Sequence, residues 1–469
     1  MRDWARSFTD VTREHGFEPL RVEGRLPDAL RGTYFRNGPG LVTSFGEPYR
    51  HWFDGDGLVS AVRYDGGKAE GGARLLQTKG LLEERQRGQR YFGSFGTKPP
   101  GLWNPWRMLR SMRGDAKNPA NTALLNWGER VFGLCEIGRP FEFDPATLSS
   151  IGESDLGGVV PGAFSAHPHR IAKTDTQFNI GTRIGRPNAI DVFRMRPDGT
   201  AGQVTQIPLA YPTLIHDFAA TPRFLVIFVA PLRLKLLPTL FGRASFADSL
   251  EWDASQGTEV LIVPLDAPRS VRRFSVDPFW TWHVGNAFED GDRIVMDVIR
   301  YRDFPSSQRW LGSIAQGGPT EDADGVLTRF SIDPARESLD AEVLVEGTSE
   351  FPRVAPHVDG ARHSSVYCAQ HSSVAAGRHG PPDAVARVDL DGTRDRFVFP
   401  KGHYPSEAVF SPRGAGETDG WLHTLVYDAG THTSYFAVLD AAHVADGPIA
   451  TAHLDHHIPL SFHGAWRSA

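Results

Sequence analysis

The stretch Trp282-His-Val-Gly-Asn-Ala-Phe-Glu289, followed by the turn Asp290-Gly-Asp292 and the run Arg293-Ile-Val-Met-Asp-Val298, carries the pattern that decides the fold. Asp-Gly between two runs rich in apolar and β-branched residues is a strong hairpin signal. Similar runs occur at Arg130–Cys135, Phe224–Val229, Glu259–Pro264 and Leu422–Tyr427, with turns at Arg196-Pro-Asp-Gly199 and Leu390-Asp-Gly392. The pattern predicts an all-β protein.

The number and spacing of these hairpins bear on the architecture. The 49 glycines and 34 prolines fit many tight turns, and no long stretch has the 3.6-residue period of an amphipathic helix bundle. An antiparallel propeller or a sandwich remains open at this point. Hairpins that recur over hundreds of residues without a linker favour one closed propeller over separate sandwiches. We therefore expect a single domain spanning residues 1–469.

Composition excludes several classes of protein. The chain has 469 residues, of which 40% are hydrophobic and 23% charged, and these are ordinary globular values. The net charge of -6 argues against a nucleic-acid partner, which would require a basic surface. The N-terminus lacks a signal-peptide pattern, and no apolar run reaches the ~18 residues of a membrane span. Two cysteines, Cys135 and Cys368, suit a reducing compartment, so we expect a cytoplasmic protein.

Two segments break the β pattern, namely Pro99–Met112 and Pro231–Arg243. Both mix Trp, Leu, Met or Phe with Arg or Lys. Such a segment is typical of a short helix that lies on a membrane surface, with its apolar residues in the lipid and its basic residues at the headgroups. A loop packed over the core would have the same composition. Peripheral membrane association therefore stays open beside the cytoplasmic expectation.

Histidines in short, distinct signatures indicate a metal centre. A neutral imidazole binds iron, zinc, copper or nickel through one nitrogen, while a carboxylate or carbonyl usually holds the other. Each such residue taken alone is more often structural, but the set favours a shared site. The histidines are His167 in Ala-His-Pro-His, His216 in Ile-His-Asp-Phe-Ala, His283 in Trp-His-Val-Gly and His463 in Phe-His-Gly-Ala-Trp, and the candidate carboxylates are Glu136, Glu350 and Glu407.

Further motifs run along the whole chain in a fixed order. They are Gly32-Thr-Tyr-Phe-Arg-Asn-Gly-Pro-Gly40, Trp52-Phe-Asp-Gly-Asp-Gly57, Asn121-Thr122, Phe141-Glu-Phe-Asp-Pro145, His216-Asp-Phe-Ala219, Asn286-Ala-Phe-Glu289, Glu350-Phe-Pro-Arg353, Asp419-Gly-Trp-Leu-His423 and Phe462-His-Gly-Ala-Trp466. In this respect the chain resembles the carotenoid cleavage oxygenase family. The resemblance covers nearly the entire sequence.

The resemblance implies a seven-bladed β-propeller with one Fe(II) on its axis and a dome of helical loops over the active site. Insertions at about 85–120 and 230–250 would contribute to the dome. The implied iron ligands are His167, His216, His283 and His463, with Glu136, Glu350 and Glu407 hydrogen-bonded behind the last three of them. Thr122 would place its methyl group near a vacant iron position, and Phe53 would line the substrate tunnel.

The implied chemistry is the oxidative cleavage of a carbon–carbon double bond. Four neutral ligands leave Fe(II) its full charge and open positions for O2, unlike the site with two histidines and one carboxylate in many other oxygenases. A conjugated alkene held in an apolar tunnel beside the metal would then give two carbonyl products. The expected partners are thus a hydrophobic polyene and O2.

Several alternatives remain. The related lignostilbene-cleaving enzymes carry a lysine before the first glutamate, where this chain has Cys135, and an uncharged thiol favours a carotenoid or apocarotenoid substrate. An isomerase of the same fold and a propeller that only binds ligands are less favoured readings. The remaining histidine candidates are interpreted as lying outside the metal site: His169, His363, His371, His453, His456 and His457.

Overall fold

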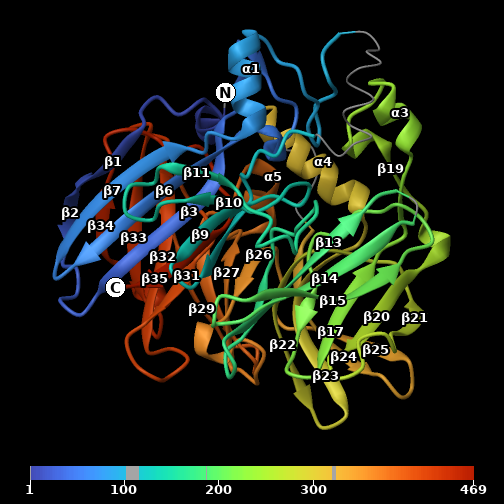
Figure 1. The fold of residues 1–469 in the computed structure, drawn as a ribbon. Helices are drawn as coiled ribbons and strands as arrows, with labels where there is room; N and C mark the ends of the chain where they lie inside the picture. The colour runs from blue at the N-terminus through green and yellow to red at the C-terminus, as the bar shows by residue number, and fades with distance from the viewer. Residues whose placement is uncertain (1, 102–115, 186, 319–323) are drawn as a thin grey trace.

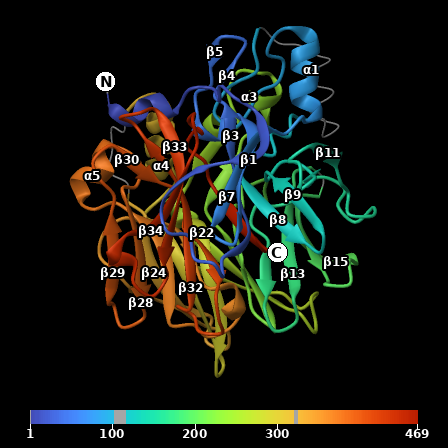
Figure 2. The same cartoon turned by 90° about the vertical axis from the view of Figure 1, so that its left-hand side faces the viewer.

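Seven sheets of four or more antiparallel strands build the protein in the computed structural model, which describes residues 2–101, 116–185, 187–318 and 324–469. The sheets follow one another along the chain and form a ring (Figures 1 and 2). The protein is thus a seven-bladed β-propeller, which confirms the all-β fold predicted from the sequence.

Five of the sheets have four strands each, contributed by one continuous part of the chain. The first two consist of β8 (Ala123–Trp127), β9 (Arg130–Leu134), β10 (Phe141–Phe143) and β11 (Ser150–Glu153), and of β12 (His169–Ile171), β13 (Thr176–Arg183), β14 (Ala189–Met195) and β15 (Ala201–Pro208). The third consists of β16 (Ala219–Ala220), β17 (Phe224–Val229), β20 (Thr258–Pro264) and β21 (Arg272–Val276). The last two are β22 (Trp280–Asp290), β23 (Arg293–Tyr301), β24 (Val326–Asp333) and β25 (Ser338–Val343), then β26 (Ser349–Arg353), β27 (Ser365–Gln370), β28 (Ala384–Asp389) and β29 (Arg394–Val398).

The two remaining sheets join the ends of the chain and close the ring. One contains β1 (His15–Pro19), β3 (Arg31–Leu41), β6 (Asp56–Asp65), β7 (Lys68–Leu75) and the C-terminal β35 (Gly464–Ser468). The other contains β2 (Arg21–Gly24), β30 (His403–Pro405), β31 (Val409–Pro412), β32 (Gly420–Asp428), β33 (Thr433–Asp440) and β34 (Pro448–His453). Because β35 pairs with β3 and β2 pairs with β34, both ends of the chain are hydrogen-bonded across the closure. Such closure protects strand edges from other chains.

The hairpin predicted from the Asp-Gly signal is present between β22 and β23. Asp290 pairs with Arg293, so the loop has two residues. The first of them, Gly291, has φ of 61°, a left-handed conformation that glycine adopts without a steric penalty. The strand that contains His283 is therefore aligned by its own turn.

Helices α1 (Lys79–Arg87), α3 (Leu236–Leu240), α4 (Phe304–Ala315) and α5 (Val374–His379) gather at one end of the ring (Figures 1 and 2). The sequence pattern did not predict α4, although Asp303 caps it by accepting a hydrogen bond from the Ser306 amide at 2.7 Å. No helix among the described residues is long and apolar enough to cross a membrane.

The two segments that break the β pattern are described to different extents. Most of Pro99–Met112 lies outside the described residues. Pro231–Arg243 contains α3, whose Leu237 is 67% exposed and is followed by Phe241 at 40%. A short helix with exposed apolar side chains is therefore present in the second segment.

Candidate metal centre

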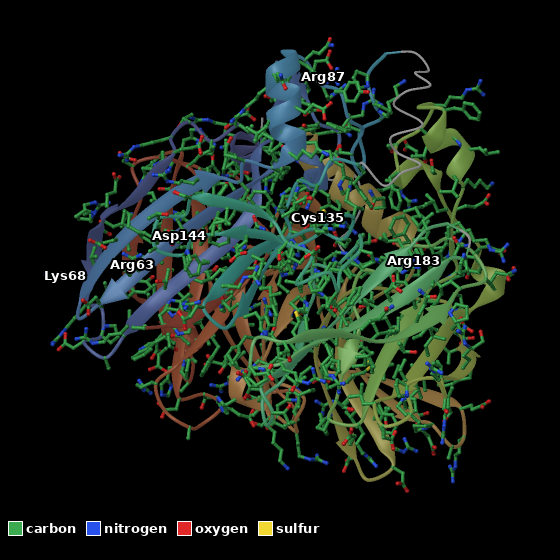
Figure 3. All side chains as sticks on the ribbon, viewed as in Figure 1. Arg63, Lys68, Arg87, Cys135, Asp144 and Arg183 are labelled. Atoms are coloured by element: carbon green, nitrogen blue, oxygen red, sulfur yellow. The ribbon has the colours of Figure 1, made fainter. Side chains whose placement is uncertain are left out.

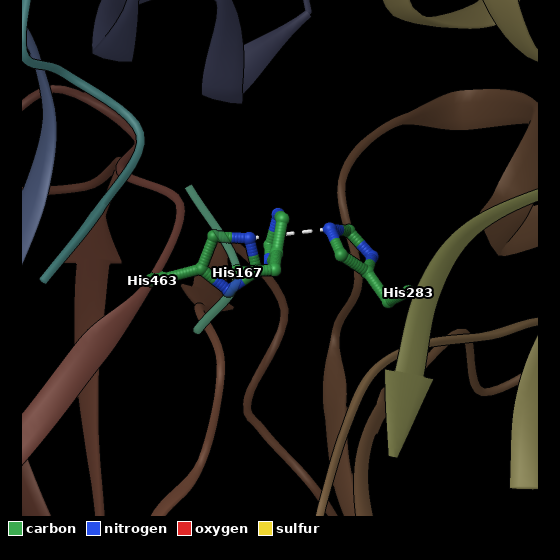
Figure 4. A group of neighbouring side chains, drawn as sticks. All are labelled: His167, His283 and His463. Carbon is green, nitrogen blue, oxygen red and sulfur yellow. Dashed lines mark hydrogen bonds between the residues drawn. The ribbon is translucent and has the colours of Figure 1, made fainter. Parts of the chain in front are cut away.

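Four of the blades each contribute one histidine to a common point. His283 lies in β22, while His167, His216 and His463 precede the edge strands β12, β16 and β35 by one to three residues. The Nε2 atoms of His167 and His216 are 3.0 Å apart, and those of His283 and His463 are 3.1 Å apart. Figure 4 shows the rings of His167, His283 and His463 converging from different strands. The structure thus brings together histidines separated by almost 300 residues in the sequence.

Three glutamates fix the orientation of three of these rings. The Nδ1 atom of His216 lies 2.7 Å from Glu136, and that of His463 lies 2.9 Å from Glu407. The Nδ1 atom of His283 is hydrogen-bonded to Glu350. A carboxylate only accepts, so in each neutral ring Nδ1 carries the hydrogen and Nε2 presents a lone pair to the centre. Among the described contacts, no carboxylate is hydrogen-bonded to His167, which agrees with the predicted asymmetry of the set.

This donor set fits a divalent transition metal. Bare lone pairs that face each other at 3.0 Å repel unless a cation lies between them. Two imidazole nitrogens that bind one ion at about 2.1 Å and at right angles to each other would be about 3.0 Å apart. Potential ligand atoms of His167, His283 and His463 all lie within 4.8 Å of one another, as do those of Glu136, His167 and His216. The assignment of the four histidines as ligands remains a prediction that this geometry supports.

Burial lowers the pKa of His167 and of His463, whereas the carboxylate of Glu350 raises the pKa of His283. The pKa values of Glu136, Glu350 and Glu407 are all lowered, so the environment favours ionised glutamates. Burial lowers the pKa of His463 to about 4, so the ring keeps its lone pair at neutral pH. Burial alone would raise the pKa of Glu407, but Arg353, His463 and Arg36 hold it well below its usual value. The guanidinium of Arg353 lies 2.8 Å from Glu407, and that of Arg36 lies 3.3 Å away. Glu407 is therefore held by two buried or half-buried cations as well as by its histidine.

An apolar cavity borders the centre on the side of the helices. Phe53 lines it and lies parallel to the His216 ring, with 6.5 Å between the ring centroids. Thr122 also lines it, with its hydroxyl donating to Asn121 at 3.1 Å. Phe53, predicted to line the substrate tunnel, and Thr122, predicted to lie beside the iron, thus line the same cavity as three of the histidines. The other lining residues near the centre are mostly aromatic: Trp52, Trp282, Tyr301, Phe351 and Phe462.

A second, polar cavity of about 190 Å³ touches the centre through His167, His283 and His463. Its walls carry Arg170, Arg353, Asp217 and Asp359. His169 also lines it, and its Nε2 atom lies 2.7 Å from Asp217. The ring of His169 therefore has a hydrogen-bond partner outside the group of four histidines.

Cys135 lies in the interior of the molecule, next to Glu136 (Figure 3). Burial raises the pKa of its thiol well above the usual value, so the side chain is uncharged. Cys135 and Cys368 are both buried free thiols.

His371, which the sequence analysis interprets as lying outside the metal site, lines the apolar cavity beside Thr348. In the sequence, the one indication that this pair lies near the cavity is that Thr348 stands two residues before Glu350. By contrast, the Nε2 atom of His363 is hydrogen-bonded to Asp297 and its Nδ1 atom to Asn286, which is a structural role. The histidines His453, His456 and His457 contact Glu23, Asp455 and Thr9, away from the centre.

Imidazoles that converge on a propeller axis beside an apolar cavity define a metal-dependent enzyme. A family model described as retinal pigment epithelial membrane protein matches residues 8–468. The chain therefore belongs to the carotenoid cleavage oxygenase family that this model represents.

Similar proteins support this membership over the full length of the chain. An apocarotenoid-15,15'-oxygenase from Synechocystis is 33% identical and aligns with 99% of this chain and 96% of its own. An isoeugenol monooxygenase from Pseudomonas putida is 26% identical over 96% of this chain and 94% of its own. The crystal structure of a cobalt-substituted Synechocystis apocarotenoid oxygenase superimposes with a TM-score of 0.88 at 32% identity, covering 100% of this chain and 98% of that one.

Proposed function

We propose that the protein is a non-haem Fe(II) dioxygenase that cleaves a conjugated C=C bond of a carotenoid or apocarotenoid with O2 and releases two carbonyl products. One observation carries this proposal: four imidazole rings, three of them held by carboxylates through Nδ1, converge with their Nε2 atoms at the wall of an aromatic-lined cavity. The likeness to the Synechocystis apocarotenoid oxygenase supports the choice of substrate class.

Each residue has a distinct role in this proposal. His167, His216, His283 and His463 would hold the iron, which supplies the redox chemistry that activates O2. Glu136, Glu350 and Glu407 keep three of the rings in the tautomer that binds a metal. Phe53 and its aromatic neighbours would hold the polyene against the centre and exclude water from the reacting double bond. Thr122 would restrict the space beside the iron.

Cleavage of a phenolic alkene is the second candidate, because the isoeugenol monooxygenase is 26% identical over nearly the whole chain. An acidic phenol would be bound best by a cation close to the first glutamate. The buried, uncharged Cys135 occupies that position. This difference favours the apolar polyene.

Cleavage is tested by loading the protein with Fe(II) under anaerobic conditions, adding O2 and identifying the products by mass spectrometry. The substrate panel holds β-carotene, apocarotenals of several lengths and hydroxystilbenes. Shortened aldehydes from a polyene are the expected result. Aldehydes from the hydroxystilbenes alone would move the assignment to the second candidate, and a change of geometry without cleavage would indicate an isomerase. Iron uptake without any reaction would favour a binding protein.

Peripheral membrane contact and the dome are part of the same proposal. A lipid-dissolved substrate has to leave the bilayer to reach the cavity. Exposed Leu237 and Phe241 on and after α3, flanked by Lys235 and Arg243, have the chemistry of a helix that dips into a membrane surface. Insertions at about 85–120 and 230–250 would then form the dome of a single propeller domain.

A further inference from the structure

The apolar cavity has a polar group at the end away from the polar cavity. Along β26, Arg353 lines the polar cavity, Glu350 lies behind His283, and Thr348, just before the strand, lines the apolar cavity. A strand rises about 3.3 Å per residue, so Thr348 lies about 7 Å beyond Glu350 on the helix side. A polyene that starts at the metal centre would extend towards this residue.

Thr348 is paired with a histidine that is itself fixed by the backbone. The Nε2 atom of His371 lies 3.0 Å from the carbonyl oxygen of Gly380, and its Nδ1 atom lies 3.0 Å from the Thr348 hydroxyl. Trp310 packs edge-on against the same ring at a centroid distance of 6.0 Å and donates to the carbonyl of Gly377. Helices α4 and α5 thus hold the histidine in place.

The contacts of His371 determine whether the Thr348 hydroxyl can still donate or accept a hydrogen bond. A carbonyl oxygen only accepts, so Nε2 of His371 carries a hydrogen. Burial lowers the pKa of His371, so the ring is neutral and its Nδ1 atom is an acceptor. The Thr348 hydroxyl therefore donates its single hydrogen to Nδ1. Its oxygen is left with acceptor capacity only, in a side chain that is partly exposed at the cavity wall.

We propose that the Thr348–His371 pair is a specificity subsite that binds a hydroxyl group on the terminal ring of the polyene, with Thr348 Oγ1 accepting the hydrogen bond. This proposal rests on the proposed function, because it requires a polyene in the cavity. A carbonyl group would gain nothing at this position, since neither partner has a hydrogen left to donate. The subsite thus selects a hydroxylated end over both a hydrocarbon ring and an aldehyde end.

The test is a binding titration of the metal-loaded full chain, which does not depend on turnover. Trp52, Trp282 and Trp310 line the cavity, so a bound polyene should quench tryptophan fluorescence. The probes are two apocarotenals of equal length, one with and one without a hydroxyl on the ring. Wild-type protein should bind the hydroxylated probe roughly 5- to 10-fold more tightly, as one hydrogen bond predicts. Thr348→Val keeps the shape of the side chain and should abolish the preference, whereas Thr348→Ser should retain it.

The outcomes separate this proposal from the proposed function. The subsite would be overturned, even if both probes are cleaved, in either of two cases. Wild type and Thr348→Val could prefer the hydroxylated probe to the same degree, or wild type could show no preference for it. A preference lost in Thr348→Val without cleavage of either probe would support the subsite and count against the dioxygenase. If neither probe binds, both proposals fail.

Discussion

The two cavities that meet at the histidines differ sharply in chemistry. Aromatic side chains line one of them, whereas the other carries Arg170, Arg353, Asp217 and Asp359. Several chain segments pass from the first to the second in the same direction, each crossing the level of the metal centre: residues 122–124, 282–286, 348–354 and 462–466. The parallel arrangement of the innermost strands therefore separates an apolar side from a polar side. In the function proposed above, a hydrophobic alkene approaches the centre from the apolar side.

The largest expected effect comes from removing one of the histidines at which the two cavities meet. In His283→Ala, three imidazoles remain, and we expect loss of bound iron and of cleavage activity. Metal analysis by mass spectrometry after anaerobic loading measures the first effect. His453→Gln is the matched control, because that ring lies away from the centre and contacts Glu23. Full iron content in His283→Ala would remove His283 from the site.

Substitution of Glu136 and of Glu407 compares two carboxylates that orient histidines of the same centre. Glu136→Gln and Glu407→Gln should each weaken metal affinity or activity by about 10- to 100-fold. Glu407→Gln also leaves Arg36 and Arg353 without their carboxylate, and breaking a buried ion pair typically costs about 3–5 kcal/mol. Chemical denaturation of the metal-free proteins should therefore show a lower free energy of unfolding for Glu407→Gln than for Glu136→Gln. Equal stabilities would show that the two arginines do not depend on Glu407.

Substitutions in the walls of the two cavities test which cavity binds the substrate. Phe53→Ser removes an aromatic side chain from the apolar cavity and should raise KM for a polyene by about 10- to 100-fold, the equivalent of roughly 1.5–3 kcal/mol of lost burial. Arg170→Ala, in the polar cavity, should leave KM within about 2-fold, because the proposed polyene does not contact that cavity. Steady-state kinetics at equal iron content compares them. The reverse order would place the substrate in the polar cavity.

The smallest expected effect concerns the proposed contact of α3 with a membrane, from which a substrate would enter the apolar cavity. Leu237→Ser with Phe241→Ser should reduce sedimentation with lipid vesicles by a few fold, because each side chain contributes buried apolar area. Cleavage of a detergent-dispersed substrate should not change. Val374→Ser, which alters an exposed side chain on α5, serves as the control. Unchanged sedimentation would remove α3 from the membrane contact.

The sequence predicts the fold and the histidine centre better than the contacts that surround the centre. Short β runs, Asp-Gly turns and the motif order indicate the propeller, and the histidine signatures indicate the centre. Contacts between residues that are distant in the sequence leave no local pattern. The clamp of Arg36 and Arg353 on Glu407, the His169–Asp217 pair and the Thr348–His371 pair were therefore not predicted. Helix α4 was missed although its Asp303 cap and Pro305 are visible in the sequence, because its surroundings are β-rich.

We propose that one metal ion, bound by the four histidines, lies between an apolar substrate side and a polar side. The most direct test of this proposal is a crystal structure of the Fe(II)-loaded protein with a bound apocarotenoid, recorded with anomalous scattering at the iron edge. The account predicts a single anomalous peak bonded to Nε2 of His167, His216, His283 and His463, with the polyene packed against Phe53. An iron peak elsewhere, or a polyene in the cavity beside Arg170, would contradict it.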